Sequence, residues 1–175
     1  MATINRAYLM LGSNIAPTLN LRLAVAYLAE LGQVIAVSSV VESPAIGPDR
    51  MPDPSYPSFL NAAVALDVAL SAPALRTALR EIETRLGRER TADKYAPRPI
   101  DIDIALFNNE QITEADFTIP DPDILQRSFL AGPLAELAPT YCHPETGETL
   151  QTIATRLGAG TLKQRPDVIL THALL

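Results

Sequence analysis

The chain has 175 residues, 47% hydrophobic and 19% charged, with a net charge of −6. These values predict one soluble globular domain over residues 1–175, and the acidic balance argues against nucleic acid as a partner. We find no apolar run of about 18 residues and no signal-peptide pattern, so we expect no membrane partner and a cytoplasmic location. The single cysteine, Cys142, excludes an internal disulfide.

The first part of the chain alternates apolar strands with one helix. Residues 7–14, "AYLMLGSN", predict a short strand that ends in a Gly-Ser-Asn turn. Leucine and valine recur at helical spacing in residues 18–32, and Gly32 stands where a helix usually stops. The β-branched segment 33–43 predicts another strand. Five prolines and one glycine make residues 44–57 a long loop, and such loops are often functional.

The next segments contain a strand, a clear helix and the strongest polar motif. Residues 58–70 favour a strand, although their alanines leave a helix open. Residues 71–87 favour a helix, because Ser71 can cap it and its leucines and isoleucine form one apolar stripe. A basic loop, 88–98, then leads into a strand within "PRPIDIDIALF", residues 97–107.

Shorter elements complete the chain. We expect a turn at 108–113, an extended piece at 116–120, a helical turn from Asp121, an apolar segment at 129–138, a turn at 144–147 and a helix at 148–157. The order strand, helix, strand, strand, helix, strand matches the split β-α-β motif. It predicts an α+β protein with a ferredoxin-like core, an antiparallel-rich sheet and helices packed mainly on one face.

Two aspartates mark the strand in "PRPIDIDIALF". Strand side chains alternate between faces, so Asp101 and Asp103 share the polar face, about 6.6 Å apart along the strand. A half-exposed strand with a polar outer face is the simpler interpretation. However, aspartate is disfavoured in strands, and like charges at neighbouring positions repel. A divalent cation between them would relieve that repulsion, and Mg²⁺ is commonly held by one or two carboxylates plus phosphates.

The basic loop could supply the matching phosphate contacts. It carries Arg88, Arg90, Lys94 and Arg98 directly before the two aspartates. A solvated loop that only aids solubility is the alternative. Together with the carboxylates, the loop indicates phosphoryl chemistry, and the missing G-x-x-x-x-G-K-[ST] sequence argues against a P-loop enzyme. We expect Cys142 to be a packed thiol and His143 a turn residue, and we expect His172 to lie in a frayed terminus.

Five separated segments resemble one family. "GRERTADKYAPRPIDIDIALF" is similar to the signature of 6-hydroxymethyl-7,8-dihydropterin pyrophosphokinase, and "LGSN", "ESPAIGP", "FLNAAVAL" and "RSFLAGPLAELAP" follow in the family's order. The resemblance implies a ferredoxin-like core, two Mg²⁺ ions and mobile loops over the site. It implies transfer of pyrophosphate from ATP to 6-hydroxymethyl-7,8-dihydropterin in folate biosynthesis, with AMP released. We expect a monomer, with a dimer as the alternative.

The resemblance also implies a role for particular residues. The metal ligands would be Asp101 and Asp103, and the catalytic arginines would be Arg88 and Arg98. The ATP site would comprise Glu83, Arg88, Arg90, Lys94, Arg98, Ile104, Thr118 and Arg127. The pterin site would comprise Ser43, Pro44, Ile46, Phe59, Asn61, Tyr95 and Phe129. An amide such as Asn61 in an apolar strand needs a partner when it is buried, which makes it the most telling of these residues.

Two departures from the family pattern accompany the match. Lys94 and Tyr95 stand where the family commonly has arginine and tryptophan, and Asp121 stands where it commonly has histidine between two prolines. The latter exchange predicts weaker nucleotide binding. Two other functions stay open: a non-catalytic ligand-binding module, and a different Mg²⁺-dependent phosphoryl or nucleotidyl transferase. An inactive homologue is a third possibility because of Asp121.

Overall fold

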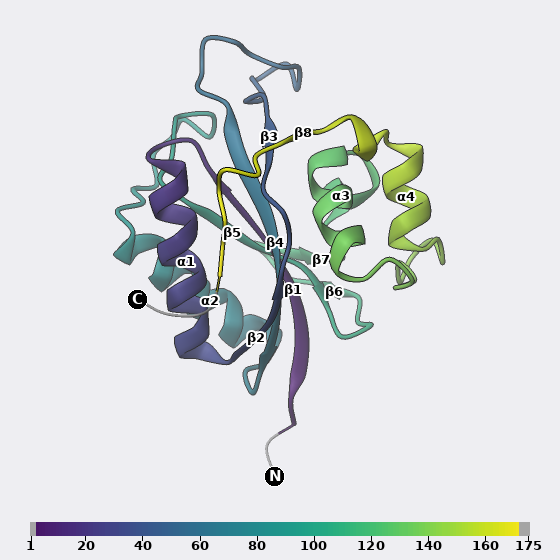
Figure 1. Cartoon of the computed structure of the whole chain (residues 1–175). Coiled ribbons are helices and arrows are strands. Elements are labelled where there is room, and N and C mark those ends of the chain that lie inside the picture. Colours follow the sequence, from purple (N-terminus) through teal and green to yellow (C-terminus); the bar gives the residue numbers. More distant parts are fainter. Residues whose placement is uncertain (1–2, 172–175) are drawn as a thin grey trace.

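A computed structural model describes residues 3–171 and divides them into one antiparallel sheet, a small hairpin and four α-helices (Figure 1). The strands are β1 (Asn5–Ser13), β2 (Gln33–Val37), β3 (Val41–Ser43), β4 (Phe59–Val68), β5 (Asp101–Phe107), β6 (Ile112–Thr113), β7 (Thr118–Ile119) and β8 (Lys163–Gln164). The α-helices are α1 (Pro17–Leu31), α2 (Ala72–Arg85), α3 (Ser128–Leu137) and α4 (Leu150–Arg156), and the 3₁₀ helices are η1 (Pro122–Leu125) and η2 (Ala159–Thr161).

The main sheet has the order β5-β1-β4-β3-β8, and β2 also pairs with β4. Every pairing is antiparallel, which confirms the α+β class and the antiparallel sheet. β6 and β7 pair separately as the hairpin. Within residues 3–171, no helix is long and apolar enough to cross a membrane.

The expected strand over residues 33–43 is two strands, β2 and β3, that follow one another along the same side of β4. Ser38 lies at the break. Its backbone N–H donates to the Ala63 carbonyl at 2.9 Å, and its hydroxyl accepts from the Ala63 N–H at 2.8 Å. A serine side chain thus replaces one ladder contact, so the chain can bend without leaving β4 unpaired.

The alanine-rich segment 58–70 forms the strand β4. β4 lies inside the sheet and is buried on both faces, which explains why it lacks a polar side. The helix expected at 71–87 is also confirmed, since the Ser71 side chain caps α2 by accepting from the Ala74 N–H at 3.4 Å. The stripe Leu75, Leu79 and Ile82 packs into the core.

Helices cover both faces of the sheet, which corrects the expectation that they lie mainly on one face. The long helices α1 and α2 pack with Leu9, Leu66 and Ile102 in the larger core, and the short α3 and α4 pack with Ala63 and Ala105 in a second core (Figure 1). Small alanines on the second face let α3 and α4 approach the strands. Because these helices are only 10 and 7 residues long, part of that face stays open.

Two of the weaker sequence candidates, Cys142 and His143, lie in the segment between α3 and α4. His143 belongs to a turn, as expected, and is 1% exposed. Cys142 is exposed, which corrects the expectation of a packed thiol: its chain segment bridges to Thr149 at the surface. His172 lies outside the described residues.

Candidate functional site

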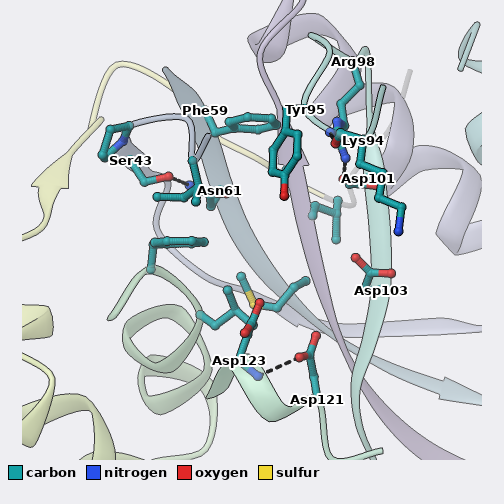
Figure 2. Close-up of a pocket in the computed structure, with 17 residues that line it drawn as sticks. Ser43, Phe59, Asn61, Lys94, Tyr95, Arg98, Asp101, Asp103, Asp121 and Asp123 are labelled. Atoms are coloured by element: carbon teal, nitrogen blue, oxygen red, sulfur yellow. Dashed lines mark hydrogen bonds and ion pairs between the residues drawn. The ribbon is translucent and has the colours of Figure 1, made fainter. Parts of the chain in front are cut away.

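A pocket opens on the second face of the sheet, beside the start of α3 (Figure 2). Its floor is formed by the ends of β1, β4 and β5, and its walls come from the loop 44–57 and the basic loop 88–98. The residues around it are Met10, Leu11, Gly12, Ser43, Pro44, Ile46, Phe59, Asn61, Lys94, Tyr95, Arg98, Asp101, Asp103, Asp121, Asp123, Phe129 and Leu130. The open part of the face is therefore where the expected site residues gather.

Strand register aligns the floor. Gly12 of β1 pairs with Asn61 on one side and Asp101 on the other. A Cβ at Gly12 would lie 3.2 Å from the Asn61 Oδ1 and 3.6 Å from the Phe59 ring. The absence of a side chain at this central position keeps the floor clear between the amide and the carboxylate.

The expected pterin residues all line this pocket. Asn61 is 6% exposed and donates from Nδ2 to the Ser43 Oγ at 2.8 Å, so its partner fixes the amide orientation. Figure 2 shows the Phe59 and Tyr95 side chains around the same space, which Phe129 also lines. Flat apolar rings and one oriented amide make a suitable environment for a planar heterocycle with hydrogen-bonding edges.

Two arginines hold Asp101. Arg88 Nη1 donates to the Asp101 Oδ1, and Arg98 Nη1 donates to the Oδ2 at 2.8 Å. The arginines come from opposite ends of the basic loop. Arg98 is itself fixed, because its backbone N–H donates to the Asn14 Oδ1 at 2.8 Å. The "LGSN" turn thereby ties the end of the loop to the end of β1.

Asp103 is less fully compensated. Its Oδ1 accepts from Arg76 Nη1 at 3.1 Å, and the side chain stays 47% exposed toward the pocket. The surrounding protein and the nearby charge of Asp101 raise the pKa of Asp103 well above its usual range. Asp103 therefore has one arginine partner and an exposed side, whereas both oxygens of Asp101 are paired with arginines.

Most of the residues expected at ATP lie in two hollows that adjoin the pocket. Lys94 and Arg98 line both the pocket and an adjoining groove that also includes Arg88 and Arg90. Ile104 and Thr118 line a further hollow, which shares Asp103 and Asp121 with the pocket. The groove therefore meets the pocket at Lys94 and Arg98, and the further hollow meets it at Asp103 and Asp121.

Glu83 and Arg127 do not line any of these hollows. Glu83 is 2% exposed: its Oε1 accepts from the Ile102 N–H at 2.9 Å, and its Oε2 accepts from Arg90 Nη2 at 2.7 Å. Its visible role is to satisfy the backbone of β5 and hold Arg90. Arg127 is the N-cap residue of α3.

Several residues that line the pocket had no predicted site role, among them Gly12, Asp121 and Asp123. Gly12 belongs to the "LGSN" segment. Its place between Asn61 and Asp101 becomes visible only once the register of β1, β4 and β5 is known. Asp123 carries no distinguishing pattern. Asp121 was noted only as a departure. It lines the pocket and also caps η1 by accepting from the Asp123 N–H at 2.9 Å, while burial raises its pKa. Asp121 therefore both caps η1 and borders the pocket.

Comparison with known proteins assigns the chain to a family. The model described as 7,8-dihydro-6-hydroxymethylpterin-pyrophosphokinase (HPPK) matches residues 8–139, which include every residue that lines the pocket. The chain belongs to the HPPK family. Membership indicates pyrophosphoryl transfer from ATP to hydroxymethyldihydropterin in folate biosynthesis.

Individual HPPK relatives agree with this assignment. The chain is 40% identical over 143 residues to a 2-amino-4-hydroxy-6-hydroxymethyldihydropteridine pyrophosphokinase of Synechocystis, which covers 80% of this chain and 70% of that protein. It is 34% identical over 167 residues to the protein of the same name from Bacillus subtilis, with 94% of each covered.

Solved structures confirm the HPPK fold. A crystal structure of Plasmodium falciparum HPPK-DHPS superposes with a TM-score of 0.70 at 15% identity. The match covers 89% of this chain and 46% of that longer chain. At this identity the likeness concerns the fold alone.

Proposed function

We propose that this chain transfers the pyrophosphoryl group of ATP to 6-hydroxymethyl-7,8-dihydropterin with Asp101 and Asp103 as ligands of two Mg²⁺ ions. In this reaction the hydroxymethyl oxygen bonds to the β-phosphorus, the bond from the β-phosphorus to the α–β bridging oxygen breaks, and AMP leaves. The hydroxyl proton is released. One observation carries the proposal: the expected pterin residues and both aspartates line the same pocket.

The pterin end of the pocket provides recognition without charge. Phe59 and Phe129 offer ring faces, and Asn61, held by Ser43, offers its Oδ1 to a ring N–H. Because the amide is buried, a ligand that leaves it unpaired loses a hydrogen bond with little compensation from water. This pairing favours a heterocycle with amide-like edges over an equally flat hydrocarbon.

The donor set suits magnesium. Asp101 and Asp103 are hard oxygen donors side by side, and the Asp103 side chain is 47% exposed with a single arginine partner. Among residues 3–171 no group of three or more His, Cys, Asp and Glu side chains is placed to hold an ion. A site with two carboxylates fits Mg²⁺, which accepts one or two protein carboxylates and completes its coordination with water and phosphates. When bound, Mg²⁺ neutralises charge on the β- and γ-phosphates.

Arg88 and Arg98 would stabilise the transferred group. Both guanidinium groups already converge on Asp101 from the two ends of the basic loop. Phosphate oxygens offer the same acceptor geometry as a carboxylate, so these arginines can bind them in the same region. Lys94 and Arg90 add positive charge along the adjoining groove. Preorganised cations of this kind act where negative charge develops during transfer.

The nucleoside would lie on the other side of Asp103. Ile104 and Thr118 line the hollow there, and an apolar side chain next to a hydroxyl suits an adenosine group. We assign Arg127 to the same end of ATP by family resemblance only. Glu83 would act through Arg90 and β5 and not by contact with ATP.

The test is release of AMP from ATP and Mg²⁺, measured with and without 6-hydroxymethyl-7,8-dihydropterin. We expect AMP formation that depends on both the pterin and the metal. Asp101→Ala and Asp103→Ala should each lower turnover at least 100-fold, with unchanged circular dichroism, because each removes a metal ligand. AMP formation without pterin, or ADP as product, would indicate another transferase. No turnover with retained pterin binding would indicate a binding module.

A further inference from the structure

Strand β5 is an edge strand of the main sheet, and charged side chains from α2 and the residue that follows Gly87 cover its free edge. Arg88 Nη1 donates to the Ile100 carbonyl at 2.8 Å. Glu83 accepts from the Ile102 N–H at 2.9 Å, and Arg76 Nη1 donates to the Ile102 carbonyl at 3.2 Å. The backbone groups of an exposed edge are thus paired by side chains instead of another strand.

Two of these arginines repeat one arrangement. Arg88 Nη1 bridges the carbonyl of residue 100 and the carboxylate of Asp101. Arg76 Nη1 bridges the carbonyl of residue 102 and the carboxylate of Asp103. Each guanidinium therefore ties a carboxylate to the backbone immediately before it. Such a tie limits the rotation of the aspartate side chain.

Arg76 is well placed to keep this arrangement fixed. Its side chain is only 11% exposed, because it lies between α2 and β5. Its Nε lies 3.9 Å from the Asp116 Oδ2, which gives the guanidinium a second anionic neighbour. Within the described residues, the Asp103 Oδ2 accepts no hydrogen bond, so the tie through Oδ1 leaves this oxygen available on the pocket side.

We infer that Arg76 is a positioning residue, which orients Asp103 for the metal as Arg88 orients Asp101. The inference rests on the proposed function, since it assumes that Asp103 binds the metal. Although Arg76 also lines the hollow of Ile104 and Thr118, its effect on metal binding runs through Asp103. A carboxylate held in one rotamer loses less conformational freedom when it binds a cation, so metal affinity should depend on this arginine.

The experiment measures Mn²⁺ binding by electron paramagnetic resonance in the presence of α,β-methylene-ATP, whose α–β bond cannot be cleaved in the transfer. Arg76→Met removes the tie and keeps a long apolar side chain. We expect at least a fivefold weaker Mn²⁺ affinity and a lower kcat, with the KM for pterin unchanged. Arg76→Lys keeps the charge on a shorter side chain without the guanidinium plane, so its Mn²⁺ affinity should be at least twofold weaker than that of wild type.

Arg80→Met is the matched control. Arg80 lies one turn further along α2 and pairs with Asp116 but not with Asp103, so its loss should leave Mn²⁺ affinity within twofold. Equal losses of Mn²⁺ affinity in Arg76→Met and Arg80→Met would overturn the inference, because any positive charge on α2 would then support metal binding equally well. Unchanged Mn²⁺ affinity in a folded Arg76→Met would also overturn it. If Arg76→Met fails to fold, unchanged affinity in Arg76→Lys has the same meaning.

The wild-type protein separates this inference from the proposed function. Wild-type protein that binds no Mn²⁺ and makes no AMP would overturn the proposed metal site and the role of Arg76 with it. Wild-type binding with no difference in the Arg76 variants would overturn the positioning role alone. If the Arg76 variants lose affinity for α,β-methylene-ATP in the absence of metal, Arg76 contacts the nucleotide. That result also contradicts the inference.

Discussion

Single residues in the pocket combine structural and chemical roles. Asp121 is the clearest case: its carboxylate caps η1 and also borders the space shared with Asp103. Gly12 is another, because it maintains the sheet while leaving the floor clear. Substitutions at such positions therefore need controls that separate folding from ligand binding.

Asp121→His should tighten ATP binding. An ionised carboxylate repels phosphates and cannot donate a hydrogen bond, whereas histidine can donate one. Removing the repulsion between partly exposed charges is worth about 1 kcal/mol, or roughly fivefold in dissociation constant. Asp121→Asn is the matched control, because asparagine keeps the cap and removes only the charge. Calorimetry at low ionic strength is the measurement, and identical ATP affinities in all three proteins would show that Asp121 does not influence the nucleotide.

Phe129→Ala should weaken pterin binding while sparing ATP. Aromatic pair interactions contribute about 0.5–1.5 kcal/mol beyond burial, so the pterin dissociation constant should rise at least several-fold. Calorimetry with pterin and α,β-methylene-ATP measures both ligands. Tyr27→Ala, on α1 and on the opposite side of the sheet, is the control for general loss of an aromatic ring. Equal pterin affinities in wild type and Phe129→Ala would mean that Phe129 contributes to packing and not to pterin binding.

At the scale of elements, pairing between strands brings the site together and also stabilises it. β1 contributes at both ends: Gly12 joins Asn61 to Asp101, and Arg6 faces Asp67 of β4. Arg6 donates to both oxygens of Asp67, and this contact lowers the pKa of the Asp67 carboxyl. A bidentate pair across two strands fixes their register far from the pocket.

Asp67→Asn should destabilise the protein by about 0.5–1 kcal/mol at pH 7, as expected for a partly exposed ion pair. Because the folded pKa of Asp67 is depressed, its contribution is complete above the unfolded pKa and is lost as pH falls through the lower folded value. The difference from wild type should therefore begin to shrink as pH falls below about 4, and it should shrink further toward lower pH. Urea unfolding at pH 7 and pH 3 measures it, with the exposed Glu114→Gln as control. A difference at pH 3 that is as large as the difference at pH 7 would contradict the ion-pair origin.

The whole molecule consists of two cores on one sheet. α1 and α2 cover one face completely enough to bury most of the larger core, and α3 and α4 cover the other only in part (Figure 1). The pocket occupies what the short helices leave open. Function thus depends on an asymmetry between the two faces.

Because both cores share the same strands, they should unfold together. Leu79→Ala in the larger core and Leu134→Ala in the smaller one remove fully buried side chains, and each should lower the free energy of unfolding by about 2–5 kcal/mol. Differential scanning calorimetry should show a single transition in both variants, at lower temperature than in wild type. Two resolved transitions would mean that α3 and α4 form a separate unit, against the prediction of one domain.

Local patterns in the sequence determined the elements and the family. Alternation in "IDIDI" placed three isoleucines in the core and two aspartates on the other face, and spacing of leucines identified α1 and α2. These features depend only on neighbouring residues. The five matching segments identified the HPPK family, which the comparisons confirm.

Tertiary structure decided which distant residues act together. Sequence could not place α3 and α4 on the second face, because an apolar helix fits either side of a sheet until small residues such as Ala63 and Ala105 show where there is room. Nor could it connect Arg76 with Asp103, which are 27 positions apart. Such contacts arise only when α2 packs beside the free edge of β5, because packing alone brings the guanidinium within hydrogen-bonding distance of both a backbone carbonyl and a carboxylate.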